Sequence, residues 1–374
     1  MFAKLFKHWM YPVAVMAGSI IGVGFFSLPY ITMKAGVVTM LFYFVALTIL
    51  VVCLHAIFAR ISLKTPDFKR FPGFVGYYLG PWPKKAALIL ANGGAFGILL
   101  VYLLVAGEFL TTIFFPIFGG SLSIYVLLFF AAVSFVLYFG IKMISKIEFW
   151  ALSLLGLLFA IIFIKGFPQI ALSNFFIQNQ VFEVKNFFLP YGAILFSLWG
   201  TGLIPEIEEM IRGHKQSLVK IVTIATLIPA AIYALFIFLV LGVSGSQTTE
   251  FALTGLKTFF SNGIITVALV MGVMAIFMAF ISQGLILKKS FMYDMGVKEF
   301  PSWALVCFVP LALFLMGFNS FIPLISFVGG VFLGINGIFI LLMYRKIGGR
   351  KIIIYPLIGV FVLGIIYSLI YFIN

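Results

Sequence analysis

The sequence predicts an all-α polytopic membrane protein with eleven transmembrane helices, and three observations carry that prediction. The 374-residue chain is 64% hydrophobic, well above the roughly 45–50% of a soluble domain. Only 9% of its residues are charged, and its mean hydropathy is +1.24. Its apolar residues form long runs of the length that an α-helix needs to cross a bilayer. These features exclude a soluble globule, a disordered chain and, because strand-type alternation does not persist, a transmembrane barrel.

Charged residues divide the apolar runs into eleven candidate spans. The spans cover residues 9–33, 37–59, 85–115, 123–139, 147–164, 186–209, 218–243, 262–287, 302–317, 321–344 and 352–373. The least distinct separation is the short stretch 318–320, between the ninth and tenth spans. All of the spans are expected to belong to one transmembrane domain that covers the whole chain.

The distribution of basic residues predicts the orientation of the spans. If the N-terminus is cytoplasmic, 20 of the 24 Lys and Arg residues fall on the cytoplasmic side. The four on the outer side are Lys34, Lys165, Lys185 and Lys257. Reversing the chain or removing one span would destroy this segregation, which is the signature of cytoplasmic loops. The net charge of +14 is therefore explained by topology and needs no nucleic-acid partner.

Two spans carry glycine clusters near their centres, where a membrane helix needs its backbone hydrogen bonds. The first span reads AGSIIGVG over residues 17–24, and the sixth reads FSLWGTG over residues 196–202. Close helix packing is the alternative explanation, because Gly18 and Gly22 have the GxxxG spacing.

The two clusters occupy corresponding positions in two successive sets of five spans. The first set covers residues 9–165 and the second covers 186–344, with 352–373 as an additional helix. Because five is odd, the second set enters the membrane in the opposite orientation. Interrupted helices at corresponding positions of inverted repeats point to a binding site near the bilayer midplane. The sequence thus predicts a 5+5 inverted repeat whose first and sixth helices are discontinuous.

Broken helices predict the chemistry of that site. The N–H groups at the start of one half-helix favour an anion, and the C=O groups at the end of the other favour a cation. A zwitterionic amino acid carries both charges on one carbon. Its carboxylate is expected at the amides of residues 22–24, and its ammonium at carbonyls near Gly18 and residues 196–198. Neither break contains a charged side chain.

At these residues the chain resembles amino-acid transporters with the LeuT-type fold. The stretch 18–24 followed by Leu-Pro-Tyr at 28–30 is similar to their first helix, within the amino acid/auxin and aromatic amino-acid permease branches of the amino acid–polyamine–organocation superfamily. Further similar stretches, in the same order, are 63–65, 76–80, 107–110, 204–206 and 329–334. The resemblance covers residues 11–346. It implies a secondary active transporter that imports a neutral, hydrophobic or aromatic amino acid by ion-coupled alternating access.

The resemblance also implies the residues of the substrate site. Substrate contacts are expected from Gly18, Ser19, Gly22, Gly24, Ser197, Trp199, Gly200 and Thr201. Selectivity for the side chain is expected from the third span, near Gly94, Phe96 and Gly97. Trp199 is expected in the pocket rather than in packing, because it lies within the break.

A coupling cation, either Na⁺ or H⁺, is the only ligand implied besides the amino acid, and no cofactor is expected. Its site would use the backbone carbonyls of Gly18 and Ile21 with Ala279 and the hydroxyl of Ser282. The chain departs from sodium-coupled relatives at Phe25, which replaces an asparagine, and at Gln283, which replaces a second hydroxyl. The choice of ion therefore stays open.

Three ionisable residues within the spans are candidates for gating or proton relay, because charged groups inside a membrane are costly. They are Glu108, His55 and Glu206. Each also has a structural interpretation: a helix-end contact for Glu108, a packed histidine for His55, and, for Glu206, an inner gate of ion pairs that it would form together with Glu208 and Glu209.

The sequence carries no sign of catalysis. It has three histidines and two cysteines without metal-ligand spacing, no HExxH and no GxxxxGK[ST] loop. An enzyme and a metal site are therefore not expected. The alternatives that remain are an exchanger or carrier of another zwitterion or organic cation such as a polyamine, and a non-transporting membrane sensor. The short polar N-terminus suits a prokaryotic inner membrane, and a bundle of this size could function as a monomer.

Overall fold

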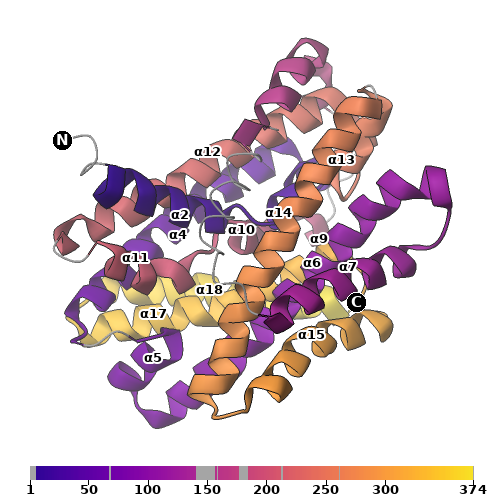
Figure 1. The fold of residues 1–374 in the computed structure, drawn as a ribbon. Helices are drawn as coiled ribbons and strands as arrows, with labels where there is room; N and C mark the ends of the chain where they lie inside the picture. Colours follow the sequence, from indigo (N-terminus) through magenta and orange to yellow (C-terminus); the bar gives the residue numbers. More distant parts are fainter. Residues whose placement is uncertain are drawn as a thin grey trace.

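The structure is a computed structural model that describes residues 6–66, 69–139, 156–157, 159–176, 184–211, 214–260 and 262–373. Within these residues every regular element is a helix and none is a strand (Figure 1). Seven helical segments are long and apolar enough to cross a membrane, and a bent pair would make eight. The all-α membrane fold is therefore confirmed, whereas the number of eleven crossings stays a prediction.

Each of the eleven expected spans contains a described helix. Uninterrupted long helices are α4 (Val37–Lys64), α6 (Pro81–Phe118), α7 (Leu122–Phe139), α12 (Leu218–Ser244), α14 (Asn262–Lys289) and α18 (Lys351–Ile373). Shorter apolar helices are α15 (Glu299–Leu315) and the segment Phe159–Gln169. The first part of the expected fifth span, residues 147–155, lies outside the described residues.

The first and sixth spans are interrupted at their glycine clusters, as predicted. The first consists of α2 (Tyr11–Ile20), the short turn η2 (Gly24–Ser27) and α3 (Leu28–Ala35), and it bends by 51°. The sixth consists of α10 (Leu189–Leu198), η5 (Thr201–Leu203) and α11 (Ile204–Met210). Pro29 and Pro205 lie in the first turns of α3 and α11, where a missing N–H costs no helical hydrogen bond.

The tenth span also departs from a regular helix, which the sequence did not predict. A π-helical turn, η10 (Val328–Leu333), joins α16 (Phe321–Phe327) to α17 (Gly334–Lys346). A Cβ atom at Gly329 would lie 1.9 Å from the carbonyl oxygen of Gly192 on α10. The backbones of the sixth and tenth spans therefore touch directly, and only glycine fits at this point.

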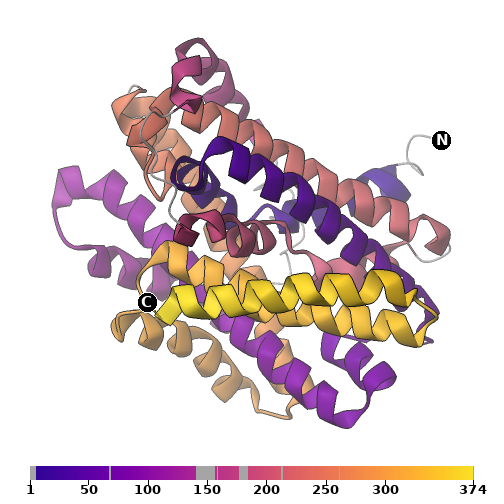
Figure 2. The same cartoon turned by 180° about the vertical axis from the view of Figure 1, so that it is seen from behind.

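The helices form one bundle around the two interrupted spans. α12 packs against α2, α3 and α4, and α6 packs against α14. Figure 2 shows α17 and α18 side by side along the outside of the bundle. The first described helix, η1 (Phe6–Met10), and the end of α18 lie at opposite ends of the bundle in both views (Figures 1 and 2). A chain that crosses the membrane an odd number of times has its two ends on opposite sides in this way.

Candidate substrate site

The two interrupted spans pack against each other at their breaks. A Cβ atom on Gly24 would lie 2.6 Å from both Phe196 Cδ1 and Ser197 Oγ. Ser197 is buried, and its hydroxyl donates to the carbonyl of Ala193 at 2.8 Å. The lack of a side chain at Gly24 thus brings the start of one half-helix against the end of the other. This is the arrangement that the sequence predicted for a site between helix ends.

Some of the backbone amides at the start of the outer half of the first span already donate hydrogen bonds within the protein. The Gly22 amide donates to the Ile20 carbonyl at 2.8 Å. The first hydrogen bond of η2 runs from the Phe26 amide to the Val23 carbonyl at 3.2 Å. The amides of residues 23–25 precede that bond, in the position whose N–H groups a helix leaves for capping groups or ligands. The expected carboxylate contact at residues 22–24 stays a prediction; within it the Gly22 amide already has an acceptor in the protein.

A tyrosine missed by the sequence reasoning bridges the carbonyl ends of the two breaks. The hydroxyl of Tyr233, from the middle of α12, lies 2.9 Å from the Ile20 carbonyl oxygen and 3.1 Å from that of Ser197. Its side chain is fully buried and stacks on Phe25 with ring centroids 5.3 Å apart. One carbonyl expected to meet the substrate's ammonium, that of Ser197, thus accepts a hydrogen bond from the protein itself. The sequence signal was weak, because Tyr233 is one of fifteen tyrosines and shares its span with Thr223 and Thr226.

Replacing Tyr233 by phenylalanine is expected to destabilise the protein. The ring contact with Phe25 would remain, and the Ile20 carbonyl would keep the Gly22 amide as a donor, but the buried Ser197 carbonyl would lose the Tyr233 hydroxyl. An unsatisfied buried polar group costs about 1–3 kcal/mol. A fall in the thermal unfolding temperature of the purified Tyr233→Phe variant would show this. Tyr138→Phe, at an exposed ring on α7, is the matched control and should unfold like the unmodified protein. Equal unfolding temperatures for the two variants would contradict the bridging role.

His55 on α4 contacts the sixth span at its break. Its Nε2 lies 3.1 Å from the Gly200 amide nitrogen, and its Nδ1 lies 2.8 Å from the Thr226 hydroxyl on α12. The ring is fully buried. Trp199 meets it edge-on with ring centroids 6.1 Å apart. The expected packed histidine is therefore present, and its partners belong to the break.

The third span faces the first break through a tyrosine rather than through glycines. A Cβ atom on Gly22 would lie 3.5 Å from the Tyr102 hydroxyl of α6. Phe96, expected to line the pocket, is half-buried and lies near Phe291, with ring centroids 5.9 Å apart. Tyr102 is thus the residue of the third span nearest the break for which the structure gives a contact.

Gly94 and Gly97, which were expected to shape selectivity, face the tenth span. A Cβ atom on Gly94 would lie 3.1 Å from Phe332 Cβ, and one on Gly97 would lie 2.4 Å from Val328 Cγ2. These two glycines allow α6 to approach η10 closely.

The exposed residues around the breaks lie on one half of each span. Ser19 and Gly202 are exposed, and Gly18, Gly22 and Trp199 are half-exposed. The outer residues 23–28 are all buried, as are Ser197, Gly200 and Thr201. The exposed positions belong to, or adjoin, the halves α2 and α11, which lead to the Lys/Arg-rich end. The two exposed positions, Ser19 and Gly202, therefore lie toward the end predicted to be cytoplasmic.

The predicted cation site stays a prediction. Gly18, Ile21, Ala279 and Ser282 are all half-buried. Within the described residues the Ser282 hydroxyl makes no hydrogen bond, so it is available as a ligand but is not tied to the first span.

On the predicted outer side, aromatic contacts close the bundle above the breaks. Phe26 packs edge-on against Phe109 at 5.1 Å, and Phe251 stacks on Phe321 at 4.7 Å. Phe251 immediately precedes α13 (Ala252–Gly255), whose Leu253 is fully buried. These aromatic pairs and Leu253 form an outer layer that lies between the breaks and the predicted outer end of the bundle.

Glu108, a predicted relay residue, lies near this outer layer. It is half-buried on α6 and interacts electrostatically with Glu250, in the segment before α13. Burial raises the pKa of Glu250 above its usual range, and the Lys34 ammonium partly opposes that rise. Glu250 is therefore a group that this layer favours in its protonated form.

The raised pKa of Glu250 predicts a pH dependence of stability. Just above the usual glutamate pKa of about 4.3, the folded protein keeps a proton that the unfolded chain has released. Stability should then fall as pH rises through the raised pKa. Unfolding temperatures measured across this range should fall less steeply in Glu250→Gln than in the unmodified protein. Parallel curves for the two proteins would refute the assignment.

At the predicted inner end, Glu206 lies in the first turn of α11, where the helix dipole favours a carboxylate. Its Oε2 atom is buried and has no hydrogen-bond partner among the described residues. Nearby, Glu208 accepts a hydrogen bond from Ser62 and pairs with Lys215 at 2.7 Å, and Arg70 pairs with Asp294 at 3.1 Å. Of the three glutamates expected in ion pairs, Glu208 forms one with Lys215, and Arg70 and Asp294 form a second pair at this end.

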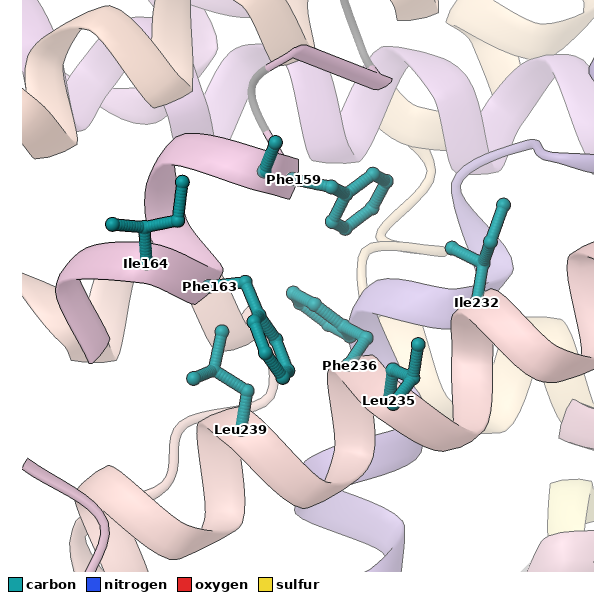
Figure 3. Close-up of a pocket in the computed structure, with 8 residues that line it drawn as sticks. Phe159, Phe163, Ile164, Ile232, Leu235, Phe236 and Leu239 are labelled. Carbon is teal, nitrogen blue, oxygen red and sulfur yellow. The ribbon is translucent and has the colours of Figure 1, made fainter. Parts of the chain in front are cut away.

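A cavity of about 290 Å³ lies between the segment 159–164 and α12 (Figure 3). Phenylalanine, isoleucine, leucine and alanine side chains make up its lining. Its lining contains no group that could recognise a carboxylate or an ammonium. Phe159 and Phe236 of the lining pack against Phe25 of the first break, with ring centroids 5.3 and 5.0 Å apart. Ile164 and Leu235 at its edge are strongly exposed, which places the cavity on the outer surface of the bundle.

The family of the chain follows from its sequence profile. The tryptophan/tyrosine permease family matches residues 7–359. The chain belongs to the tryptophan/tyrosine permease family. The permease is therefore a transporter and not an enzyme, and the expected kinship with aromatic amino-acid permeases is confirmed. No curated protein sequence matches it.

Solved structures share the fold of the permease. The transporter MhsT, in a crystal structure with L-phenylalanine, superposes with a TM-score of 0.62 at 16% identity, covering 98% of this chain and 99% of MhsT. Mhp1 is a nucleobase-cation-symport-1 family transporter whose structure is in a closed conformation with bromovinylhydantoin bound. It superposes with a TM-score of 0.67 at 14% identity, covering 96% of this chain and 89% of Mhp1. Both are LeuT-fold transporters, so the expected LeuT-type fold is confirmed at the level of architecture.

Proposed function

We propose that this permease imports tryptophan or tyrosine across a prokaryotic inner membrane by alternating access, driven by an ion gradient. The N-terminus would be cytoplasmic and the C-terminus outside. The family name supports an aromatic amino acid, and the phenylalanine bound to MhsT shows that a transporter of this fold accommodates one.

The observation that carries the proposal is the direct contact of the two breaks at Gly24. It places the amides of residues 23–25 beside the end of α10, so that a carboxylate and an ammonium on one carbon can meet opposite helix ends. The half-exposed rings of Phe96 and Trp199 supply apolar surface for an aromatic side chain. The break residues contain no carboxylate, which disfavours a polyamine as substrate.

Uptake of labelled tryptophan into proteoliposomes tests the proposal. Inward sodium and proton gradients should be imposed separately, with unlabelled tyrosine, phenylalanine and leucine as competitors. Accumulation driven by either gradient and inhibited by tyrosine more than by leucine is expected. If sodium drives it, Ser282→Ala should reduce the sodium response. If no aromatic amino acid is accumulated under either gradient and none is exchanged in counterflow, the proposed function is rejected.

A further inference from the structure

The hydrogen bonds of His55 determine its protonation state in this arrangement. A backbone N–H can only donate, so the Nε2 atom facing the Gly200 amide at 3.1 Å must carry a lone pair. The Thr226 hydroxyl donates its one hydrogen to the Val222 carbonyl at 2.8 Å, so it accepts from Nδ1. The ring is therefore neutral, with its hydrogen on Nδ1, and all of its polar atoms are satisfied.

A proton on Nε2 would break this arrangement. Two N–H groups, one from the ring and one from Gly200, would then point at each other at hydrogen-bond distance. An imidazole can take up a proton only at a nitrogen with a lone pair, and here that nitrogen is Nε2. Protonation must therefore open the contact between α4 and the break of the sixth span.

Opening that contact would move the two breaks together. A Cβ atom on Gly200 would lie 2.6 Å from Ile20 Cγ1, so the last residue of α2 packs directly on Gly200. Ile20 is also the residue whose carbonyl accepts the Tyr233 hydroxyl. A shift of Gly200 thus displaces the end of α2 as well as the start of η5, the residues that frame the proposed substrate site.

No carboxylate within the described residues compensates a charge on the ring. The groups that touch it are the Thr226 hydroxyl, the Gly200 amide and the Trp199 indole. The ionisable residues of α4 and of the elements packed on it are Tyr43, Cys53, Arg60, Lys64, Tyr30, Lys34, Tyr191, Glu206, Glu208, Glu209, Lys220, Tyr233, Tyr344, Arg345 and Lys346. On α4 the nearest charged residue is Arg60, five residues away and so about 7.5 Å along the axis.

We propose that His55 carries the coupled proton. The ring is neutral while it holds the Gly200 amide, as here, and it takes up one proton on Nε2 when the break opens toward the outer side. That proton comes from the outer water and is released to the inner water when the contact with Gly200 re-forms. The inference rests on the proposed function, because a substrate bound at the breaks must favour the open contact. By linkage, substrate and proton then strengthen each other's binding equally.

Histidine NMR tests the first step directly. The chain has three histidines, and His8 and His214 lie near the inner end as a ring pair 4.7 Å apart. In a His8→Gln, His214→Gln background, ring-labelled His55 gives the remaining signal. Without substrate it should be neutral and protonated on Nδ1. Saturating tryptophan at constant pH should convert it toward the doubly protonated ring. A hydrogen on Nε2 without substrate, or no change on tryptophan binding, would overturn the proposal.

Transport measurements test the second step. The unmodified protein should take up about one proton per bound tryptophan and accumulate tryptophan under a proton gradient. His55→Gln keeps an acceptor for the Gly200 amide but no titratable group, so it should still exchange tryptophan in counterflow without accumulating it. Proton-driven accumulation by His55→Gln would refute the proposal.

A second variant covers the case in which His55→Gln does not fold. Thr226→Val removes the acceptor of the Nδ1 hydrogen but keeps the ring, so it should reduce the population of the Nδ1-protonated form. An unchanged Nδ1-protonated signal in Thr226→Val would overturn the assignment. If neither tryptophan nor tyrosine binds, the proposed function fails, and the coupling proposed for His55 fails with it. The NMR signal of the substrate-free protein still reports separately whether the His55 ring carries its hydrogen on Nδ1.

Discussion

Gly329→Ala is expected to cause a large loss of stability. Its Cβ atom would lie 1.9 Å from the Gly192 carbonyl oxygen and 2.9 Å from the Phe196 amide nitrogen. Both neighbours are backbone atoms, so no side-chain rotation can relieve the clash. Overpacking a well-packed core costs about 1–3 kcal/mol, and occasionally more. The variant should unfold at a markedly lower temperature in nanodiscs, or fail to yield folded protein.

Gly359→Ala is the matched control for this change. It lies inside α18, where a Cβ atom would meet nothing within 4 Å. Alanine is a better helix former than glycine by about 1 kcal/mol, so this variant should be as stable as the unmodified protein or slightly more stable. If Gly329→Ala unfolded at the same temperature as Gly359→Ala, the backbone contact between the sixth and tenth spans would be wrong.

Gly24→Ala is expected to abolish transport with less effect on folding. The added methyl would meet Phe196 Cδ1 and Ser197 Oγ, each at 2.6 Å. Because both neighbours are side-chain atoms, the two half-helices can separate slightly and still fold. The separation would misplace the amides of residues 23–25 relative to α10. Tryptophan binding, measured by calorimetry on purified protein, should weaken by at least about tenfold, which corresponds to about 1.4 kcal/mol.

Two other glycines of the breaks provide controls. A methyl group on Gly202 would meet nothing within 4 Å, and one on Gly22 would make an ordinary contact with the Tyr102 hydroxyl at 3.5 Å. Gly202→Ala should therefore bind tryptophan like the unmodified protein, and Gly22→Ala should remain folded. Normal uptake by Gly24→Ala would show that the contact of the two breaks does not form the substrate site.

The features that the sequence predicted well are local ones. Long apolar runs are bounded by charges, and the two clusters of closely spaced glycines near span centres mark helix interruptions, so the spans and both breaks were visible. The π-helical turn η10 was not, because it depends on Gly192, more than a hundred residues away from Gly329. Whether a glycine marks a break or a close helix contact depends on its neighbour in space.

The candidate site shows the same limit. Sequence reasoning selected His55 because an ionisable group within a span is unusual, but Gly200 and Thr226, which define its state, lie 145 and 171 residues further along the chain. Tyr233 and Tyr102 were harder to single out among fifteen tyrosines. Their function follows from the hydroxyl position, which neither composition nor helical spacing provides.

The backbone contact between Gly192 and Gly329 divides the sixth span into an anchored half and a free half. α10 is fastened to the tenth span through main-chain atoms, whereas α11 beyond the break is held by side chains such as Glu208. A change in the angle between the two halves would therefore fall on residues 199–201, which join α10 to α11. His55 contacts Gly200 within this junction, so the proton proposed for its ring would act directly between the anchored half and the rest of the span.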